Sequence, residues 1–162
     1  APSKTFNLAG LQVSNIFIPN QKVRRAFRKQ IDAAGYSQLN TLGLVACQAA
    51  YTYGEEWLTQ VKAYIRSNIT FVDDYLKQNL PQIKMLPIEG TYLVWLDCSA
   101  LGMTADEREQ WLWHEAKLWL DGGGIFGKEG EAFERINVAC PRATLLQGLE
   151  QLKAAVEGLK KE

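Results

Sequence analysis

The 162-residue chain contains few of the residues that bind metals or form disulfides. It has one histidine, His114, and three cysteines that lie far apart without a CxxC pair: Cys47, Cys98 and Cys140. An odd number of scattered cysteines argues against a disulfide framework and a zinc site, and one histidine excludes most histidine-based metal centres. We therefore interpret the cysteines as reduced thiols that pack as small hydrophobic side chains, and we expect no bound metal.

The chain also lacks an excess of charge of either sign, because its 18 basic and 18 acidic side chains cancel. That balance argues against a nucleic-acid partner, which would require a basic surface. No apolar run approaches the length of a membrane span, and the sequence begins without a charged-then-apolar signal segment. These absences predict a cytoplasmic protein that binds neither nucleic acid nor membrane. Its 47% hydrophobic content is ordinary for a globular protein.

Four segments have the pattern of β-strands. Residues 11–18 (LQVSNIFI), 83–88 and 91–98 (TYLVWLDC) are short and apolar or β-branched, and residues 135–140 (RINVAC) alternate between apolar and polar side chains. Strands that alternate with helical segments predict a mixed α/β protein with a short sheet packed by helices.

Helical periodicity predicts helices over 20–34, over 40–80 with a break at Gly54, over 104–120, and at the C-terminus. The third of these begins with a capping box that runs from Thr104 to Glu107. We expect the glycines at 122–124 to end this helix. We expect residues 121–134 to form a flexible approach to a functional site, because no phosphate-loop motif follows the glycines.

Two segments carry the functional information: residues 3–10 (SKTFNLAG) and residues 135–142 (RINVACPR). The first resembles the surroundings of the Schiff-base lysine in pyridoxal-phosphate (PLP) enzymes of the aspartate-aminotransferase fold. The second resembles the carboxylate-binding strand of the same family. Both are most similar to the carbon–sulfur β-lyase branch, the cystathionine β-lyase type of class I/II aminotransferase relatives.

The resemblance implies a role for each matching residue. Lys4 would be the catalytic lysine that binds PLP covalently, and Ser3 would donate to the cofactor phosphate. Arg135 would bind the substrate carboxylate, since a guanidinium matches a carboxylate with two parallel hydrogen bonds; taken alone, it would be interpreted as a surface salt bridge. Tyr92 would line the active-site entrance or pack in the core. Arg142 would have a structural role at the start of the last helix.

One position departs from the family pattern. In aminotransferases proper, an arginine often lies eight residues after the lysine and binds the phosphate, whereas this chain has Gln12 there. A neutral amide cannot replace that charge, so the phosphate must be held differently. This departure argues against a typical aspartate aminotransferase.

The resemblance implies an α,β-elimination that converts a cystathionine-like or cysteine-like amino acid into a thiol, pyruvate and ammonia. It also implies that the chain is the C-terminal part of an enzyme. Residues 1–40 would end the large cofactor domain, residues 41–80 would form a linking helical region, and residues 81–162 would form the small C-terminal domain.

On this interpretation the 162 residues alone bind PLP weakly or not at all and have no useful turnover, and the protein forms a homodimer or self-associates in another way. Two alternatives remain open from the sequence. One is a class I/II aminotransferase, and the other is a non-catalytic α/β association domain in which Lys4 and Arg135 are incidental.

Overall fold

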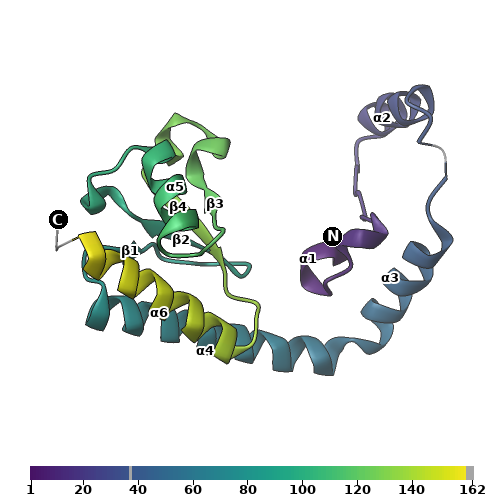
Figure 1. Ribbon diagram of the computed structural model, residues 1–162. Coiled ribbons are helices and arrows are strands. Elements are labelled where there is room, and N and C mark those ends of the chain that lie inside the picture. The colour runs from purple at the N-terminus through teal and green to yellow at the C-terminus, as the bar shows by residue number, and fades with distance from the viewer. Residues whose placement is uncertain (37, 160–162) are drawn as a thin grey trace. The chain divides into compact units, whose positions relative to one another are not determined.

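The computed structural model describes residues 1–36 and 38–159 and divides the chain into two compact units, Ala1–Lys62 and Ala63–Glu162. We refer to these as the first and second units; Figure 1 follows them by colour along the chain. The division falls inside helix α4 (Glu55–Asn79), whereas the sequence predicts divisions near residues 40 and 80, which remain predictions. Within the described ranges, no helix is both long and apolar enough to cross a bilayer.

The first unit is helical. Asn20 and Asn40 begin its two longer helices by accepting hydrogen bonds from Val23 N (3.1 Å) and Leu42 N (2.9 Å). Gly54 separates the second of these from α4, as the sequence predicts. The helices of this unit before α4 are α1 (Pro2–Thr5), α2 (Gln21–Ala33) and α3 (Thr41–Tyr53).

Residues 13–20 form no regular secondary structure, so the prediction of a strand over 11–18 is wrong. Leu11 ends a 3-10 turn (Ala9–Leu11), and Gln12 adopts a left-handed backbone with φ of 51°. A strand requires a hydrogen-bonded neighbour, and no strand of the described residues pairs with this segment. Its side chains are accordingly split between buried and exposed: Val13 is 5% exposed and Phe17 is 88% exposed.

The second unit contains an antiparallel sheet of four strands in the order β1-β2-β4-β3. This sheet and the helices around it confirm the mixed α/β class. The predicted strands at 83–88, 91–98 and 135–140 are present in shortened or shifted form, and the sequence did not predict β3. The bounds are β1 (Lys84–Met85), β2 (Leu93–Asp97), β3 (Asp121–Gly122) and β4 (Phe133–Asn137).

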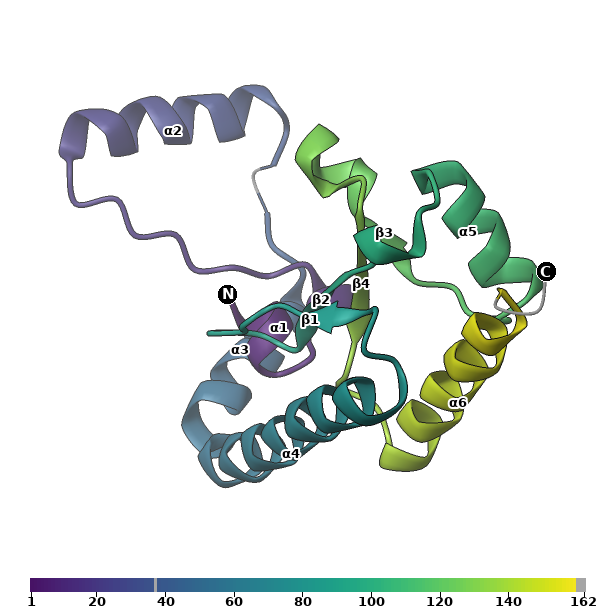
Figure 2. The same cartoon turned by 90° about the vertical axis from the view of Figure 1, so that its left-hand side faces the viewer.

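One face of this sheet carries the hydrophobic core. In the β2–β4 ladder Val94 lies opposite Ile136 and Leu96 opposite Glu134, and Val94 and Leu96 are almost fully buried. Helices of the second unit pack against this face, as Figures 1 and 2 show. These are the later part of α4, α5 (Ala105–His114) and α6 (Arg142–Leu159). The other face, which carries the alternate residues of each strand, is described below with the candidate site.

Arg142 joins α6 to α4. Its Nε donates to Asn68 Oδ1 (2.8 Å) and its guanidinium lies 4.3 Å from the centre of the Phe71 ring. Asn68 is fully buried and donates to the carbonyl oxygens of Val138 (2.8 Å) and Cys140 (3.0 Å). These bonds fix the end of β4 and the start of α6 on α4, which is the structural role that the sequence predicts for Arg142.

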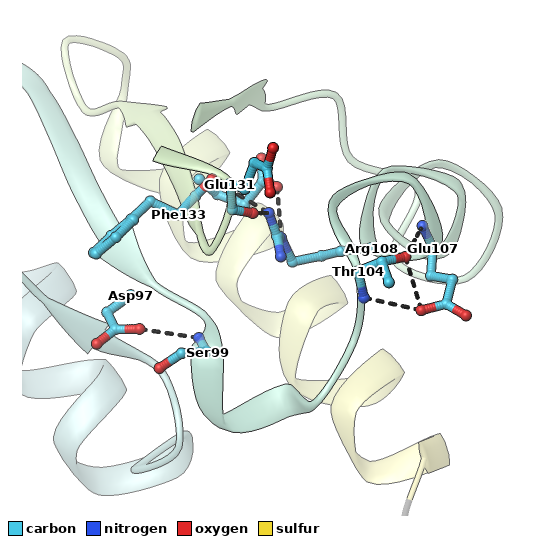
Figure 3. Close-up of polar contacts among 8 residues, drawn as sticks. Asp97, Ser99, Thr104, Glu107, Arg108, Glu131 and Phe133 are labelled. Carbon is cyan, nitrogen blue, oxygen red and sulfur yellow. Dashed lines mark hydrogen bonds and ion pairs between the residues drawn. The ribbon is translucent and has the colours of Figure 1, made fainter. Parts of the chain in front are cut away.

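Helix α5 begins as predicted but ends at His114, so the prediction of a helix to residue 120 is wrong. The capping box is present, because Thr104 Oγ1 accepts from Glu107 N and Glu107 Oε2 accepts from Thr104 N (2.9 Å) (Figure 3). At the other end Leu118 N donates to Leu112 O (2.9 Å) across Lys117, whose φ is +54°. The left-handed Lys117 therefore turns the chain just beyond the end of the helix, and periodicity does not reveal such a turn.

The glycines at 122–124 do not end a helix, and the middle one, Gly123, lies in a close backbone packing. Gly122 belongs to β3, and a 3-10 turn follows over Gly123–Phe126. A Cβ on Gly123 would lie about 2.1 Å from Gly130 O, which no side chain can tolerate. The two backbones therefore approach closely, and residues 121–134 form two strands and two 3-10 turns instead of the expected flexible loop.

The three cysteines are unpaired, and Cys47 and Cys98 are buried. Burial raises the pKa of the Cys98 thiol to about 12 from 9.0. Since the thiolate is the reactive form, we expect Cys98 to react with a thiol reagent about a thousandfold more slowly in the native protein than in denaturant. Peptide mapping after timed maleimide labelling at pH 7.5 measures both rates; equal rates would contradict a packing role for Cys98.

Candidate functional site

The four residues predicted to form the site divide between the two units. Ser3 and Lys4 belong to the first unit, and Tyr92 and Arg135 belong to the second. The structure therefore describes two partial sites, each with its own geometry.

Lys4 lies in α1, a single helical turn that packs on the first unit through its neighbours. The Phe6 ring contacts Tyr51 edge-on with centroids 5.3 Å apart and stacks near Trp57 at 6.3 Å. A Cβ on Gly54 would lie about 2.7 Å from the Phe6 ring, so the glycine that separates α3 from α4 also makes room for this packing. Phe6 thereby fixes the segment that carries Lys4.

The Lys4 side chain is exposed, and its amine has no hydrogen-bond or ion-pair partner among residues 1–36 and 38–159. Ser3, one position earlier, is half-buried and presents a hydroxyl. An unpaired primary amine beside a hydroxyl matches the chemistry that a cofactor with an aldehyde and a phosphate requires: a nucleophile for the first and a hydrogen-bond donor for the second. The residues present therefore fit PLP.

Arg135 lies on the sheet face opposite the core, and the adjacent strand supplies its partner. Asp121 of β3 pairs with Arg135 of β4 in register. Its Oδ2 accepts from both Nε (3.1 Å) and Nη2 (2.8 Å) of Arg135. The Arg135 side chain is 23% exposed and that of Asp121 is 50% exposed. The salt bridge considered as the alternative for Arg135 therefore exists, and it leaves part of the guanidinium accessible.

Aromatic rings surround Arg135 on the same face. The Phe126 ring lies 4.6 Å from the guanidinium carbon, within the range of a cation–π contact. Trp95 lies opposite Arg135 on β2, and its ring meets those of Phe126 (5.3 Å) and Phe133 (6.4 Å) edge-on. The result is a cation with a carboxylate on one edge and an aromatic ring on one face.

The sequence did not identify Asp121, Phe126 or Trp95 as parts of the site. Asp121 lies in a two-residue strand, which is too short for periodicity to reveal, and the glycines beside it suggested a loop. Trp95 lies within a continuous apolar run whose buried and open faces composition does not distinguish. Only the register of the sheet brings these side chains together.

Tyr92 packs against the hydrophobic core of the second unit. Its carbonyl oxygen accepts from Val138 N (3.0 Å), which extends the β2–β4 pairing by one residue. Of the two roles considered for Tyr92, core packing is the one with contacts to support it, and a role at the entrance remains a prediction.

Comparison with known proteins gives a consistent result. The chain is 40% identical over 156 residues to the cystathionine β-lyase PatB of Bacillus subtilis. The matched region covers 96% of this chain and 40% of that relative. The crystal structure of cystalysin from Treponema denticola, which contains pyridoxal 5'-phosphate, superposes with a TM-score of 0.95 at 42% identity over 98% of this chain and 40% of cystalysin. The chain has the fold of the C-terminal part of PLP-dependent aminotransferase-fold enzymes.

The chain is also similar to aminotransferases. The aspartate aminotransferase of Pyrococcus horikoshii is 26% identical over 162 residues, 98% of this chain and 40% of the relative. No family model matches the chain. The chain spans about 40% of the length of the curated relatives it matches.

Proposed function

We propose that the chain is part of a PLP-dependent carbon–sulfur β-lyase that eliminates the thiol from a cystathionine-like or cysteine-like amino acid. The observation that carries the proposal is the similarity to cystathionine β-lyase PatB over nearly the whole chain, with a lysine and an arginine in chemically suitable settings. The products would be a thiol, pyruvate and ammonia.

Bound PLP supplies an electron sink that stabilises negative charge at the substrate Cα. Lys4 Nζ would hold the cofactor aldehyde and, as a free amine, would accept the proton from the substrate Cα. As the proton leaves, the Cβ–S bond breaks and its electron pair departs with sulfur as the thiolate. The remaining three-carbon product takes up water to give pyruvate and ammonia. Ser3 would donate a hydrogen bond to the phosphate, and Arg135 would bind the α-carboxylate and thereby orient the Cα–H bond.

Transamination is a second candidate function, because an aspartate aminotransferase is among the relatives. Both reactions begin with removal of the Cα proton and differ in where that proton returns. Gln12 argues against a typical aspartate aminotransferase, since it is neutral where aminotransferases proper often have a phosphate-binding arginine. Supplying the complete PLP-loaded enzyme of which this chain is part, called the PLP-loaded protein below, with a 2-keto acid decides between them: amino-group transfer to the keto acid would replace the lyase proposal with the aminotransferase one.

The proposal extends to the turnover of the 162 residues alone, the oligomeric state and the location of the protein. The 162 residues alone are expected to have no useful turnover, because they cover about 40% of the relatives' length. The active protein is expected to be a cytoplasmic homodimer. Unpaired cysteines are typical of a reducing compartment such as the cytoplasm. Exposed apolar side chains on the first unit, such as Leu42 at 70% exposure, are typical of a surface that binds another protein chain. Sedimentation of the PLP-loaded protein measures the oligomeric state.

Arg135→Lys tests the carboxylate clamp. Lysine keeps the positive charge but loses the planar pair of donors. A hydrogen bond to a charged group contributes about 1.5–3 kcal/mol, so we expect KM to rise by about tenfold to a hundredfold with a smaller change in kcat. Steady-state kinetics of the PLP-loaded protein measures the split. An unchanged KM would contradict the assignment of Arg135 to the carboxylate.

A further inference from the structure

The donor groups of Arg135 are only partly used by the protein. A guanidinium has five N–H groups, and a single oxygen of Asp121 accepts two of them, from Nε and Nη2. Within the described part of the chain, Nη1 of Arg135 has no hydrogen-bond partner. Nη1 and the second hydrogen of Nη2 therefore form an unused end with two parallel N–H groups.

This end has the shape that a second carboxylate requires. Two parallel N–H groups of a guanidinium bind both oxygens of a carboxylate in one plane. Asp121 occupies the neighbouring edge and does not need to leave for that contact to form. The angle at which the free end points is set by the register that places Asp121 directly opposite Arg135.

Phe126 limits the remaining motion of the guanidinium. Its ring covers one face of the group at 4.6 Å, and Trp95 supports the Phe126 ring from the side at 5.3 Å. A long arginine side chain otherwise loses rotational freedom when it binds a ligand. An arginine that is held before binding has already lost part of that freedom, which favours binding.

We propose that Asp121 and Phe126 are positioning residues that hold Arg135 with its Nη1–Nη2 end directed at the α-carboxylate of an amino-acid substrate. The proposal rests on the proposed function, because it assigns the ligand of Arg135. Recognition of the carboxylate therefore also depends on Asp121, which lies on the adjacent strand and does not touch the substrate. Asp121 also offsets the charge of Arg135, so that selection depends on directional hydrogen bonds more than on charge.

Asp121→Asn and Phe126→Leu test the proposal in the PLP-loaded protein, with Asp74→Asn on the exposed surface of α4 as the matched control. Asparagine keeps an oxygen acceptor without the charge, and leucine keeps bulk without the ring. We expect KM to rise by about three- to tenfold in both variants with kcat within about twofold, because Asp121→Asn loses the charged partner of the guanidinium and Phe126→Leu loses the ring that covers it. Turnover of a substrate analogue without the α-carboxylate should not change, and Asp74→Asn should behave as the parent.

A second readout does not depend on turnover. L-Alanine has the α-carboxylate but no β-leaving group, and its binding can be followed through the Nε–H resonance of Arg135 by NMR. We expect the Asp121→Asn variant to bind L-alanine at least about threefold more weakly, with a broadened Nε–H resonance, because the guanidinium is less fixed. Thermal unfolding should not change, since exposed ion pairs contribute little to stability.

The opposite results would overturn the proposal in recognisable ways. A lower KM and tighter L-alanine binding in Asp121→Asn would make Asp121 a competitor of the substrate. Parent-like KM and Nε–H signals would make the pair incidental. If Arg135→Lys raises KM and Asp121→Asn does not, only this inference fails; if Arg135→Lys has no effect either, the proposed carboxylate clamp fails with it.

Discussion

Lys4→Ala is expected to lower kcat of the PLP-loaded protein by at least about a thousandfold, because it removes both the covalent anchor of the cofactor and the base that accepts the Cα proton. General acid–base catalysis alone contributes about a hundredfold to ten-thousandfold. Thermal unfolding of the cofactor-free variant should remain that of the cofactor-free parent, since Lys4 is exposed and its amine contacts no group within the described residues. A large effect on rate without an effect on stability is the signature of a catalytic group.

The measurement combines kinetics with mass spectrometry. Borohydride reduction of the PLP-loaded protein should leave a cofactor adduct on Lys4, and Lys4→Ala should carry none at that site. Lys22→Ala on α2 is the matched control, because it removes another exposed lysine of the first unit. Full activity of Lys4→Ala, or an adduct on a different lysine, would contradict the catalytic role of Lys4, and no adduct at all would favour the non-catalytic association domain.

The two segments on which the predicted chemistry rests could be found from the sequence because their information is local. A lysine beside a hydroxyl and an arginine on an alternating strand are visible in eight residues each. The helix starts at Asn20 and Thr104 could be found for the same reason, since a cap is formed by side chains within three positions of each other.

The wrong predictions concern features that depend on residues far away in the sequence. Residues 11–18 are rich in strand-forming side chains, but a strand exists only where another strand pairs with it. Helix α5 ends at His114, and the left-handed Lys117 that follows it turns the chain in a way that no apolar stripe predicts. Asp121 reaches Arg135 through the register of two strands that lie fourteen residues apart in sequence. Each of these features depends on a partner that the local sequence does not contain.

The largest expected effect on stability concerns a buried ion pair between α5 and β4. Arg108 and Glu134 are 1% and 3% exposed, and Arg108 Nε donates to Glu134 Oε1 at 2.7 Å. Arg108 Nη2 also donates to the carbonyl oxygen of Glu131, which Figure 3 shows beside the labelled Arg108 side chain. The pair therefore lies on the core face of the sheet, and each charge depends on the other for compensation.

Arg108→Met should destabilise the protein by about 3–5 kcal/mol, because it leaves the Glu134 carboxylate buried without a partner. The double variant Arg108→Met/Glu134→Leu should recover much of that loss, since replacing both charges with apolar side chains avoids their desolvation. Urea unfolding followed by tryptophan fluorescence measures both, and four of the five tryptophans belong to the second unit. A double variant no more stable than the single one would contradict this account.

The dependence of stability on pH distinguishes an unpaired charge from a simple packing defect. Burial raises the pKa of the Glu134 carboxyl in the parent protein, and the hydrogen bond from Arg108 opposes that rise. Without Arg108 the folded-state pKa should rise further above the unfolded value. A folded state that binds more protons loses stability as pH increases. Arg108→Met should therefore be closest to the parent near pH 4.5 and lose stability as pH rises through the folded-state pKa of Glu134, whereas Arg108→Met/Glu134→Leu should lack this dependence. A pH-independent loss in the single variant would assign the cost to packing around Arg108 and not to the unpaired Glu134 carboxylate.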